Sequence, residues 1–319
     1  MRPATLAELA DRYGIAVPPP LPAAAGTWAA FQDRYDASRA ALRTPDDIAR
    51  VIAEAAADDA ADGCAWLEIQ VDPTSYAPVF GGLAPALEAV LAGAAAAPVP
   101  VGVLVASSWT RSPAHALELA RLAGAYASSG VVGFGLSNDE RGGVVADFAP
   151  AFRVARDAGL LLAPHSGFYT PAAHVRECVV ELGASRIGHG TSAAADPAVL
   201  ELLASRGVAL EICPTSYPPF GVHALSEIPL RTVLAAGVPV ALSTDDPLLF
   251  GVGLAGQYEI CRSSLGFTDE ELARVAGDGI AASAAPAELK SQLLTGVANW
   301  LDPPGNLAHT VTGGGSSVG

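Results

Sequence analysis

Short hydrophobic runs alternate along most of the chain with longer segments in which apolar residues recur every three or four positions. The short runs predict buried strands, and the longer segments predict amphipathic helices. Strands that alternate with helices this regularly form βαβ units in a parallel sheet. The predicted strands are 66–71, 101–106, 131–136, 160–164, 186–188, 208–213 and 238–244.

Capping signals mark the predicted helices. Thr44-Pro45-Asp46-Asp47 combines a hydroxyl cap, a proline at the first helical position and acids in the first turn, which predicts a helix that runs to about Asp62. Two helices are expected before it, so the first strand follows a long helical segment. The other predicted helices are 5–13, 28–42, 83–91, 113–124, 148–158, 171–183, 230–235, one that begins at 197, and several within 254–301.

The strand count decides between two α/β architectures. A TIM barrel has eight strands, one more than the seven runs found here. An open doubly wound sheet accepts seven strands, but its GxGxxG fingerprint after the first strand is absent. We therefore expect a (β/α)8 TIM barrel with the first strand missing from this chain. Residues 1–302 are predicted to form one barrel domain with N-terminal helices, and the Pro-, Gly- and Ser-rich residues 303–319 a disordered tail.

Composition and charge limit the partners of this domain. Hydrophobic residues make up 51% of the 319 positions and charged residues 16%, as expected for a large buried core. A net charge of −15 argues against nucleic acids and anionic membranes as partners. The four cysteines form no CxxC pair, and neither a signal peptide nor a membrane-length apolar run is seen. We expect a cytoplasmic protein with reduced cysteines, and the oligomeric state stays open.

Three predicted strands end in a side chain that can bind a metal or transfer a proton. These residues are His165, His189 and Asp245. A single histidine beside an apolar run is usually a hydrogen-bonded core residue. Three such residues at the C-terminal ends of parallel strands favour an active site, because barrel enzymes build their sites at that end. Two histidines and an aspartate suit a divalent metal such as zinc and a proton-shuttling imidazole.

Other acidic residues at this end have two interpretations each. Asp246 follows Asp245 directly and cannot point the same way, so it either hydrogen-bonds a substrate nitrogen or caps the helix that starts at Pro247. Asp139 and Glu140 follow the strand 131–136 and are interpreted mainly as a solvated loop pair. Neither GxSxG nor an HxE…PCxxC pattern occurs, which excludes a nucleophile-elbow hydrolase and that class of zinc deaminase.

Four motifs resemble the adenosine deaminase family of metal-dependent amidohydrolases, and the resemblance extends over about residues 3–301. The motifs are Pro-His-Ser-Gly at 164–167, Arg-Ile-Gly-His-Gly at 186–190, Glu-Ile-Cys-Pro-Thr-Ser at 211–216 and Ser-Thr-Asp-Asp-Pro-Leu-Leu-Phe at 243–250. The resemblance implies a (β/α)8 barrel in which one zinc activates water to attack C6 of an aminopurine, with release of ammonia.

The same resemblance implies a role for each matching residue. His165 and Asp245 would bind zinc, with one zinc per chain in the complete protein. His189 would orient or deprotonate the hydrolytic water. Asp246 and Gly167 would contact the substrate, a small-molecule purine, with Asp246 holding a ring nitrogen.

Two departures from the family pattern predict impaired chemistry. The His-x-His pair of the first barrel strand is absent, and the family's general-acid glutamate falls at Phe168. Loss of a general acid costs about 10²- to 10⁴-fold in rate. Our hypothesis is that the native chain begins upstream of Met1 and includes the His-x-His strand. We expect little or no activity from the 319-residue chain.

Three functions are carried forward. The first is deamination of adenosine or a related aminopurine, which requires another substrate or a substitute acid such as Glu140. The second is a catalytically silent purine-binding paralogue that kept the barrel. The third is another amidohydrolase reaction, such as amide or ester hydrolysis, which the same barrel would permit.

Overall fold

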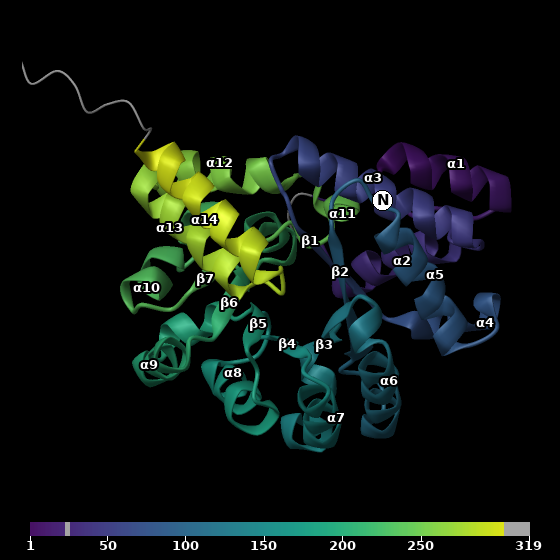
Figure 1. Cartoon of the computed structure of the whole chain (residues 1–319), viewed down its shortest axis with the longest axis horizontal. Coiled ribbons are helices and arrows are strands. Elements are labelled where there is room, and N and C mark those ends of the chain that lie inside the picture. Colours follow the sequence, from purple (N-terminus) through teal and green to yellow (C-terminus); the bar gives the residue numbers. More distant parts are fainter. Residues whose placement is uncertain (23–25, 303–319) are drawn as a thin grey trace, which may run out of the picture.

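The computed structural model describes residues 1–22 and 26–302, so the predicted tail at 303–319 lies outside the described residues. Seven parallel strands form one curled sheet in sequence order, with the helices on its outer side (Figure 1). The regular alternation read from the hydrophobic pattern is thereby confirmed. The strands are β1 (Leu67–Val71), β2 (Val101–Ser108), β3 (Val131–Ser137), β4 (Leu161–Ser166), β5 (Arg186–His189), β6 (Ala209–Ile212) and β7 (Val240–Leu242).

Three helices precede β1, and the others follow the strands as predicted. Among the helices of the described residues, only the four-residue helix α4 has no counterpart in the prediction, because a single turn has no periodicity to detect, whereas α11 begins at Pro247 as expected. The helices are α1 (Pro3–Tyr13), α2 (Trp28–Ala40), α3 (Pro45–Ala61), α4 (Ala77–Phe80), α5 (Leu83–Ala95), α6 (Pro113–Ala125), α7 (Val145–Asp157), α8 (Ala172–Glu177), α9 (Pro197–Arg206), α10 (Leu230–Ala235), α11 (Pro247–Phe250), α12 (Leu254–Leu265), α13 (Asp269–Ala282) and α14 (Ala287–Leu301).

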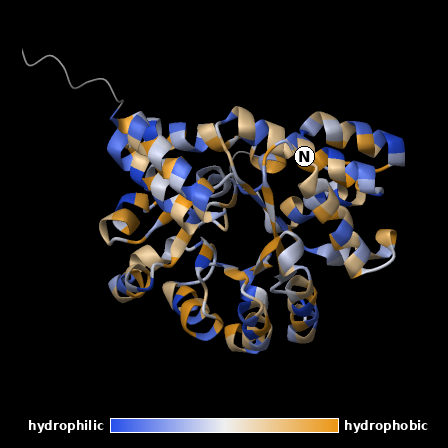
Figure 2. Ribbon diagram, in the orientation of Figure 1, coloured by the Kyte–Doolittle hydropathy of each residue, from blue (hydrophilic) through white to orange (hydrophobic). Residues whose placement is uncertain are grey.

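Hydrophobic side chains fill the layer between the sheet and the helices. Figure 2 shows hydrophobic and hydrophilic residues alternating along the outer helices, as amphipathic segments require. Phe134 of β3 packs edge-on against Phe152 of α7, with ring centroids 5.3 Å apart, and both side chains are fully buried. Within the described ranges, no helix combines the length and the apolar character needed to cross a bilayer.

The sheet curls like a TIM barrel but is not closed by the strands that the structure describes. β1 pairs with β2 and β7 pairs with β6, while no described strand joins β1 to β7. The predicted barrel with one strand missing is confirmed in this respect. The sheet is nevertheless curled enough that the side chain of Arg186 on β5 reaches Glu68 on β1 across the interior.

An ion triad occupies the interior of the curl. Arg186 Nη2 lies 2.6 Å from Glu68 Oε2, and its Nε lies 2.8 Å from Glu211 Oε1. Burial raises the pKa of Glu211 although Arg186 opposes this effect. Burial alone would also raise the pKa of Glu68, but Arg186 and hydrogen bonds from Ala284 and Trp66 bring it below its ordinary value. The triad joins β1, β5 and β6 beneath the strand ends.

The capping box of α3 gives a prediction for stability. Thr44 Oγ1 accepts a hydrogen bond from Asp47 N (3.1 Å), and Asp47 Oδ2 accepts one from Thr44 N (3.0 Å). Thr44→Ala should lower the free energy of unfolding by about 1 kcal/mol, because an N–H at the helix start loses its partner. Urea unfolding measures this change. Ser205→Ala, which removes an exposed hydroxyl bonded only to Leu202 O, is the control and should change little.

Candidate active site

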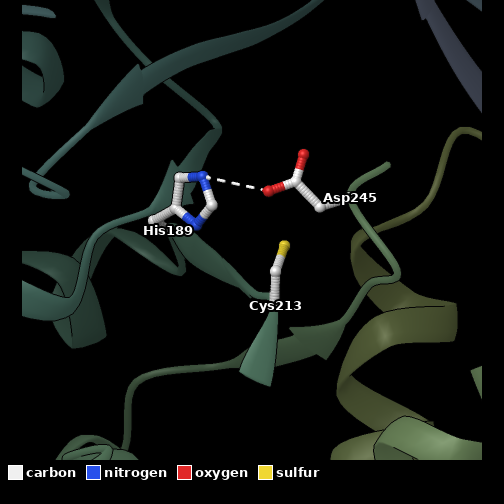
Figure 3. A group of neighbouring side chains, drawn as sticks. All are labelled: His189, Cys213 and Asp245. Carbon is white, nitrogen blue, oxygen red and sulfur yellow. Dashed lines mark ion pairs between the residues drawn. The ribbon is translucent and has the colours of Figure 1, made fainter. Parts of the chain in front are cut away.

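Three neighbouring strands bring side chains of metal-ligand types together at their C-terminal ends (Figure 3). His189 ends β5, Cys213 follows β6, and Asp245 follows β7. One potential ligand atom from each side chain lies within 4.8 Å of the others. His189 Nε2 is 3.7 Å from Asp245 Oδ2. Because the C-terminal ends of parallel strands meet at one edge of the sheet, these side chains lie in one site, as the sequence predicted for His189 and Asp245.

The backbone at these positions has an unusual conformation. His189 has φ = 64° and Asp245 has φ = 53°, both in the left-handed region that residues other than glycine rarely adopt. Such a conformation costs on the order of 1–3 kcal/mol per residue, and it persists mainly where function requires it. Gly188 gives β5 room to approach β4, since a Cβ there would lie 3.3 Å from His165 Cα. The chain is thus held in a shape that aims His189 and Asp245 into the site.

His165 of β4 completes the predicted set. Its ring centroid is 4.5 Å from that of His189, and Trp109 Nε1 donates a hydrogen bond to its backbone oxygen (2.8 Å). His165 Nδ1 faces the carboxylate of Glu140, and the ring keeps 17% of its surface exposed. His165, His189 and Asp245 all line the same cavity.

The interpretation of Glu140 as a solvated loop residue is wrong. Glu140 is fully buried, whereas its neighbour Asp139 forms a surface ion pair with Arg141 at 2.7 Å. Burial alone would raise the pKa of Glu140, but His165 and several hydrogen-bond donors hold it well below its usual range. A carboxylate that stays ionised in this way has no proton to give. Glu140 is therefore no substitute for the missing general acid.

Phe168 presents an apolar face to the site. Its ring centroid lies 4.7 Å from His189, 5.8 Å from Tyr217 and 5.6 Å from Phe220. Other aromatic rings extend this wall away from His189, through contacts that link Tyr169, Trp28, Phe31 and Phe250. No proton donor stands at position 168, as the sequence indicated.

Electrostatics distinguish the histidine from the two aspartates. Burial and the neighbouring His165 lower the pKa of His189 well below its ordinary value, which favours the neutral ring, and its Nδ1 lies 3.4 Å from the Tyr217 hydroxyl. Burial and Asp246 raise the pKa of Asp245, and burial also raises the pKa of Asp246. The capping interpretation of Asp246 is wrong, because its side chain makes no capping hydrogen bond to α11.

The site opens into a cavity of about 1580 Å³, which Asp246 also lines. Pockets for small ligands commonly measure about 300–1,000 Å³. The larger volume here arises because the cavity continues along both unpaired sheet edges, from Ala241 of β7 to Ile69 of β1.

Gly167, the other residue expected to contact the substrate, has its backbone groups engaged within the protein. Its N–H donates a hydrogen bond to Thr170 Oγ1 (3.1 Å), and its oxygen accepts one from Ser192 N (3.2 Å).

Comparison with known proteins identifies the family to which this site belongs. The family model described as adenosine deaminase matches residues 1–300. The chain belongs to the adenosine deaminase family. A putative adenosine/adenine deaminase of Streptomyces coelicolor is 52% identical over 319 residues, with 94% of this chain and 93% of the relative covered. The resemblance read from the four motifs is confirmed.

Two solved structures share the fold of this adenosine deaminase family member. An adenine deaminase from Arthrobacter aurescens superposes with a TM-score of 0.84 at 28% identity, covering 94% of this chain and 95% of that one. An amidohydrolase from Burkholderia ambifaria, solved with bound zinc, superposes with a TM-score of 0.83 at 24% identity, covering 95% and 87%. The second similarity shows the fold alone.

The donor set of this family member fits a zinc ion. Imidazole, thiolate and carboxylate are the three ligand types that zinc takes from proteins. His165 and His189 supply imidazoles to the cavity, the thiol of Cys213 lies beside Asp245, and no lysine or arginine of the described chain forms an ion pair with Asp245. A carboxylate that lines a cavity without a counter-charge suits a bound cation.

Cys213 is the site residue that sequence reasoning missed. It was interpreted as one of four reduced core cysteines, and it is indeed buried and unpaired. Its thiol nevertheless lies beside His189 and Asp245. The signal was present in the sequence, because Cys213 ends a predicted strand in the same way as the other site residues. Tyr217 holds this segment in place, since its hydroxyl accepts a hydrogen bond from Cys213 N (3.1 Å).

Proposed function

We propose that this protein catalyses the zinc-dependent hydrolytic deamination of adenine, adenosine or a related aminopurine. The convergence of His165, His189 and Asp245 on one cavity, in a chain of the adenosine deaminase family, is the observation that carries this proposal. Relatives named adenosine/adenine deaminase and adenine deaminase support the purine class. The reaction consumes one water and releases ammonia and the corresponding oxopurine.

The proposed roles follow from position and chemistry. Asp245 and His165 would hold the zinc ion, and Cys213, whose thiol lies within 4.8 Å of a carboxylate oxygen of Asp245, would be a further donor. Zinc supplies Lewis-acid activation of water at neutral pH. Neutral His189 orients the attacking water and accepts its proton. Asp246 hydrogen-bonds a ring nitrogen of the purine, and the apolar ring of Phe168 excludes bulk water on the side of His189.

Turnover is proposed to be slow because Phe168 cannot protonate the purine ring. Phe168→Glu should raise kcat about 10-fold or more over Phe168→Gln, since general acid catalysis contributes about 10²- to 10⁴-fold when fully positioned. The glutamine variant has the same size and polarity but no transferable proton. Steady-state ammonia release measures both variants. Equal rates for the two variants would show that position 168 supplies no proton in this site.

A purine panel tests the proposed function. Zinc-loaded protein is incubated with adenine, adenosine and N6-substituted adenosines, and the oxopurine is quantified together with the released ammonia or, for the N6-substituted compounds, the released amine. We expect slow, stoichiometric formation of both products from at least one of these compounds. Absence of product from every purine at one bound zinc per chain would refute deamination.

Phe168 also favours the second candidate function, a purine-binding protein without catalysis. This function predicts that adenine or adenosine raises the melting temperature of the protein while no ammonia is formed. Deamination predicts stabilisation together with product. Measuring both quantities on one sample separates the two functions.

A further inference from the structure

Glu140 has two carboxylate oxygens that serve two different parts of the molecule. Oε1 accepts hydrogen bonds from the backbone N–H groups of Phe168 (2.7 Å), Tyr169 (2.7 Å) and Thr170 (2.9 Å), and from Thr170 Oγ1 (2.9 Å). Oε2 faces His165 Nδ1. One buried side chain thus connects the turn 168–170 to the ring of His165.

The direction of the His165 contact can be deduced from the chemistry of the partners. Four donors converge on Oε1, an arrangement that suits a carboxylate acting as an acceptor, so we assign the proton between Glu140 Oε2 and His165 Nδ1 to the imidazole. An imidazole binds a metal in its neutral form, which carries one proton, so a proton on Nδ1 leaves Nε2 as the nitrogen that can bind. The Trp109 hydrogen bond to the backbone oxygen of His165 fixes the segment from which this ring extends.

We propose that Glu140 is a positioning residue that sets the tautomer and orientation of His165, leaving Nε2 as the ligand atom for the metal. Glu140 is fully buried and does not line the cavity, so it acts through His165. Carboxylate partners of this kind orient histidine ligands, and their loss typically lowers metal affinity or activity by about 10- to 100-fold. The metal part of the inference rests on the proposed function, whereas the tautomer does not.

The turn 168–170 gives Glu140 its fixed position. Three N–H groups and one hydroxyl converge on Oε1, which leaves this oxygen no freedom to rotate toward His165. Oε2 is therefore the oxygen that faces the ring. The same hydrogen bonds fix the turn that carries Phe168, whose ring packs against His189, so the position of the turn is fixed relative to both His165 and His189.

Nitrogen-15 NMR of the full 319-residue chain, with the His165 signals assigned by their loss in His165→Asn, tests the tautomer directly. We expect a protonated Nδ1 and an unprotonated Nε2 in the metal-free protein. In Glu140→Gln the side-chain amide can turn its NH₂ toward the ring, and the proton should move to Nε2. Thr170→Val is the matched control, because it removes one Oε1 partner and leaves Oε2 intact.

Metal affinity gives a second readout that is independent of turnover. Competition with a zinc chelator should show binding weakened about 10- to 100-fold in Glu140→Gln and nearly unchanged in Thr170→Val. A proton on Nε2 of His165 in the unsubstituted protein would overturn the proposal, even if Glu140→Gln fails to fold. Unchanged zinc affinity and tautomer in a folded Glu140→Gln protein would also overturn it.

These outcomes are distinguishable from failure of the proposed function. If no purine is deaminated, the tautomer and the zinc affinity still decide the role of Glu140. If purines are deaminated while Glu140→Gln changes neither the tautomer of His165 nor the zinc affinity, the deaminase function stands and Glu140 only stabilises the turn 168–170.

Discussion

Asp245→Asn is expected to lower kcat for purine deamination by about 10³-fold and to reduce bound zinc well below one per chain. The substitution removes the anionic donor of the site and leaves neutral donors around the cation. Metal ions commonly supply several kcal/mol of transition-state stabilisation, and each 1.36 kcal/mol corresponds to tenfold in rate. Metal analysis and ammonia release on the same preparation measure both effects.

Asp246→Asn is the matched control for this prediction. The two aspartates are adjacent, and burial raises the pKa of both. Asp246 is proposed to contact the purine rather than the metal, so Asp246→Asn should keep bound zinc while lowering kcat/KM. Loss of zinc in Asp246→Asn with retention in Asp245→Asn would reverse the two assignments.

Arg186→Met is expected to lower the free energy of unfolding by about 3–5 kcal/mol, the largest stability effect that we predict. Arg186 is buried between Glu68 and Glu211, and its removal leaves two carboxylates inside the sheet without a counter-charge. Urea unfolding measures the change. Arg274→Met breaks a half-exposed ion pair with Asp278 and should cost less than about 1 kcal/mol.

A compensating variant separates charge from packing. Adding Glu68→Gln and Glu211→Gln to Arg186→Met removes the uncompensated charges and should recover part of the lost stability. If Arg186→Met alone is as stable as the unsubstituted protein, the triad does not hold the curl of the sheet as described.

The parts of the fold that were predictable follow from local patterns. Gly14 ends α1 and Thr44 starts α3 where the capping signals indicated, because those signals lie within a few residues of each helix end. The strands were recognisable from apolar runs bounded by polar residues. β7 is shorter than its run because the chain leaves the ladder before Asp245, whose positive φ is not visible in a sequence.

The site was predictable only as far as it depends on strand ends. His165, His189 and Asp245 were identified because parallel strands deliver their last residues to one edge. Glu140 was misjudged because the donors that hold it come from a turn 28 to 30 residues further along the chain. No local pattern predicts such a contact, so its burial could be found only in the folded structure.

Metal removal and restoration in one preparation tests the central claim most directly. The protein is stripped with a chelator, assayed for ammonia release from adenine and adenosine, and assayed again after addition of one equivalent of zinc. Our account predicts no release after stripping, slow release after zinc addition, and no release from Asp245→Asn under either condition. Equal ammonia release with and without metal, or none after full zinc loading, would contradict it.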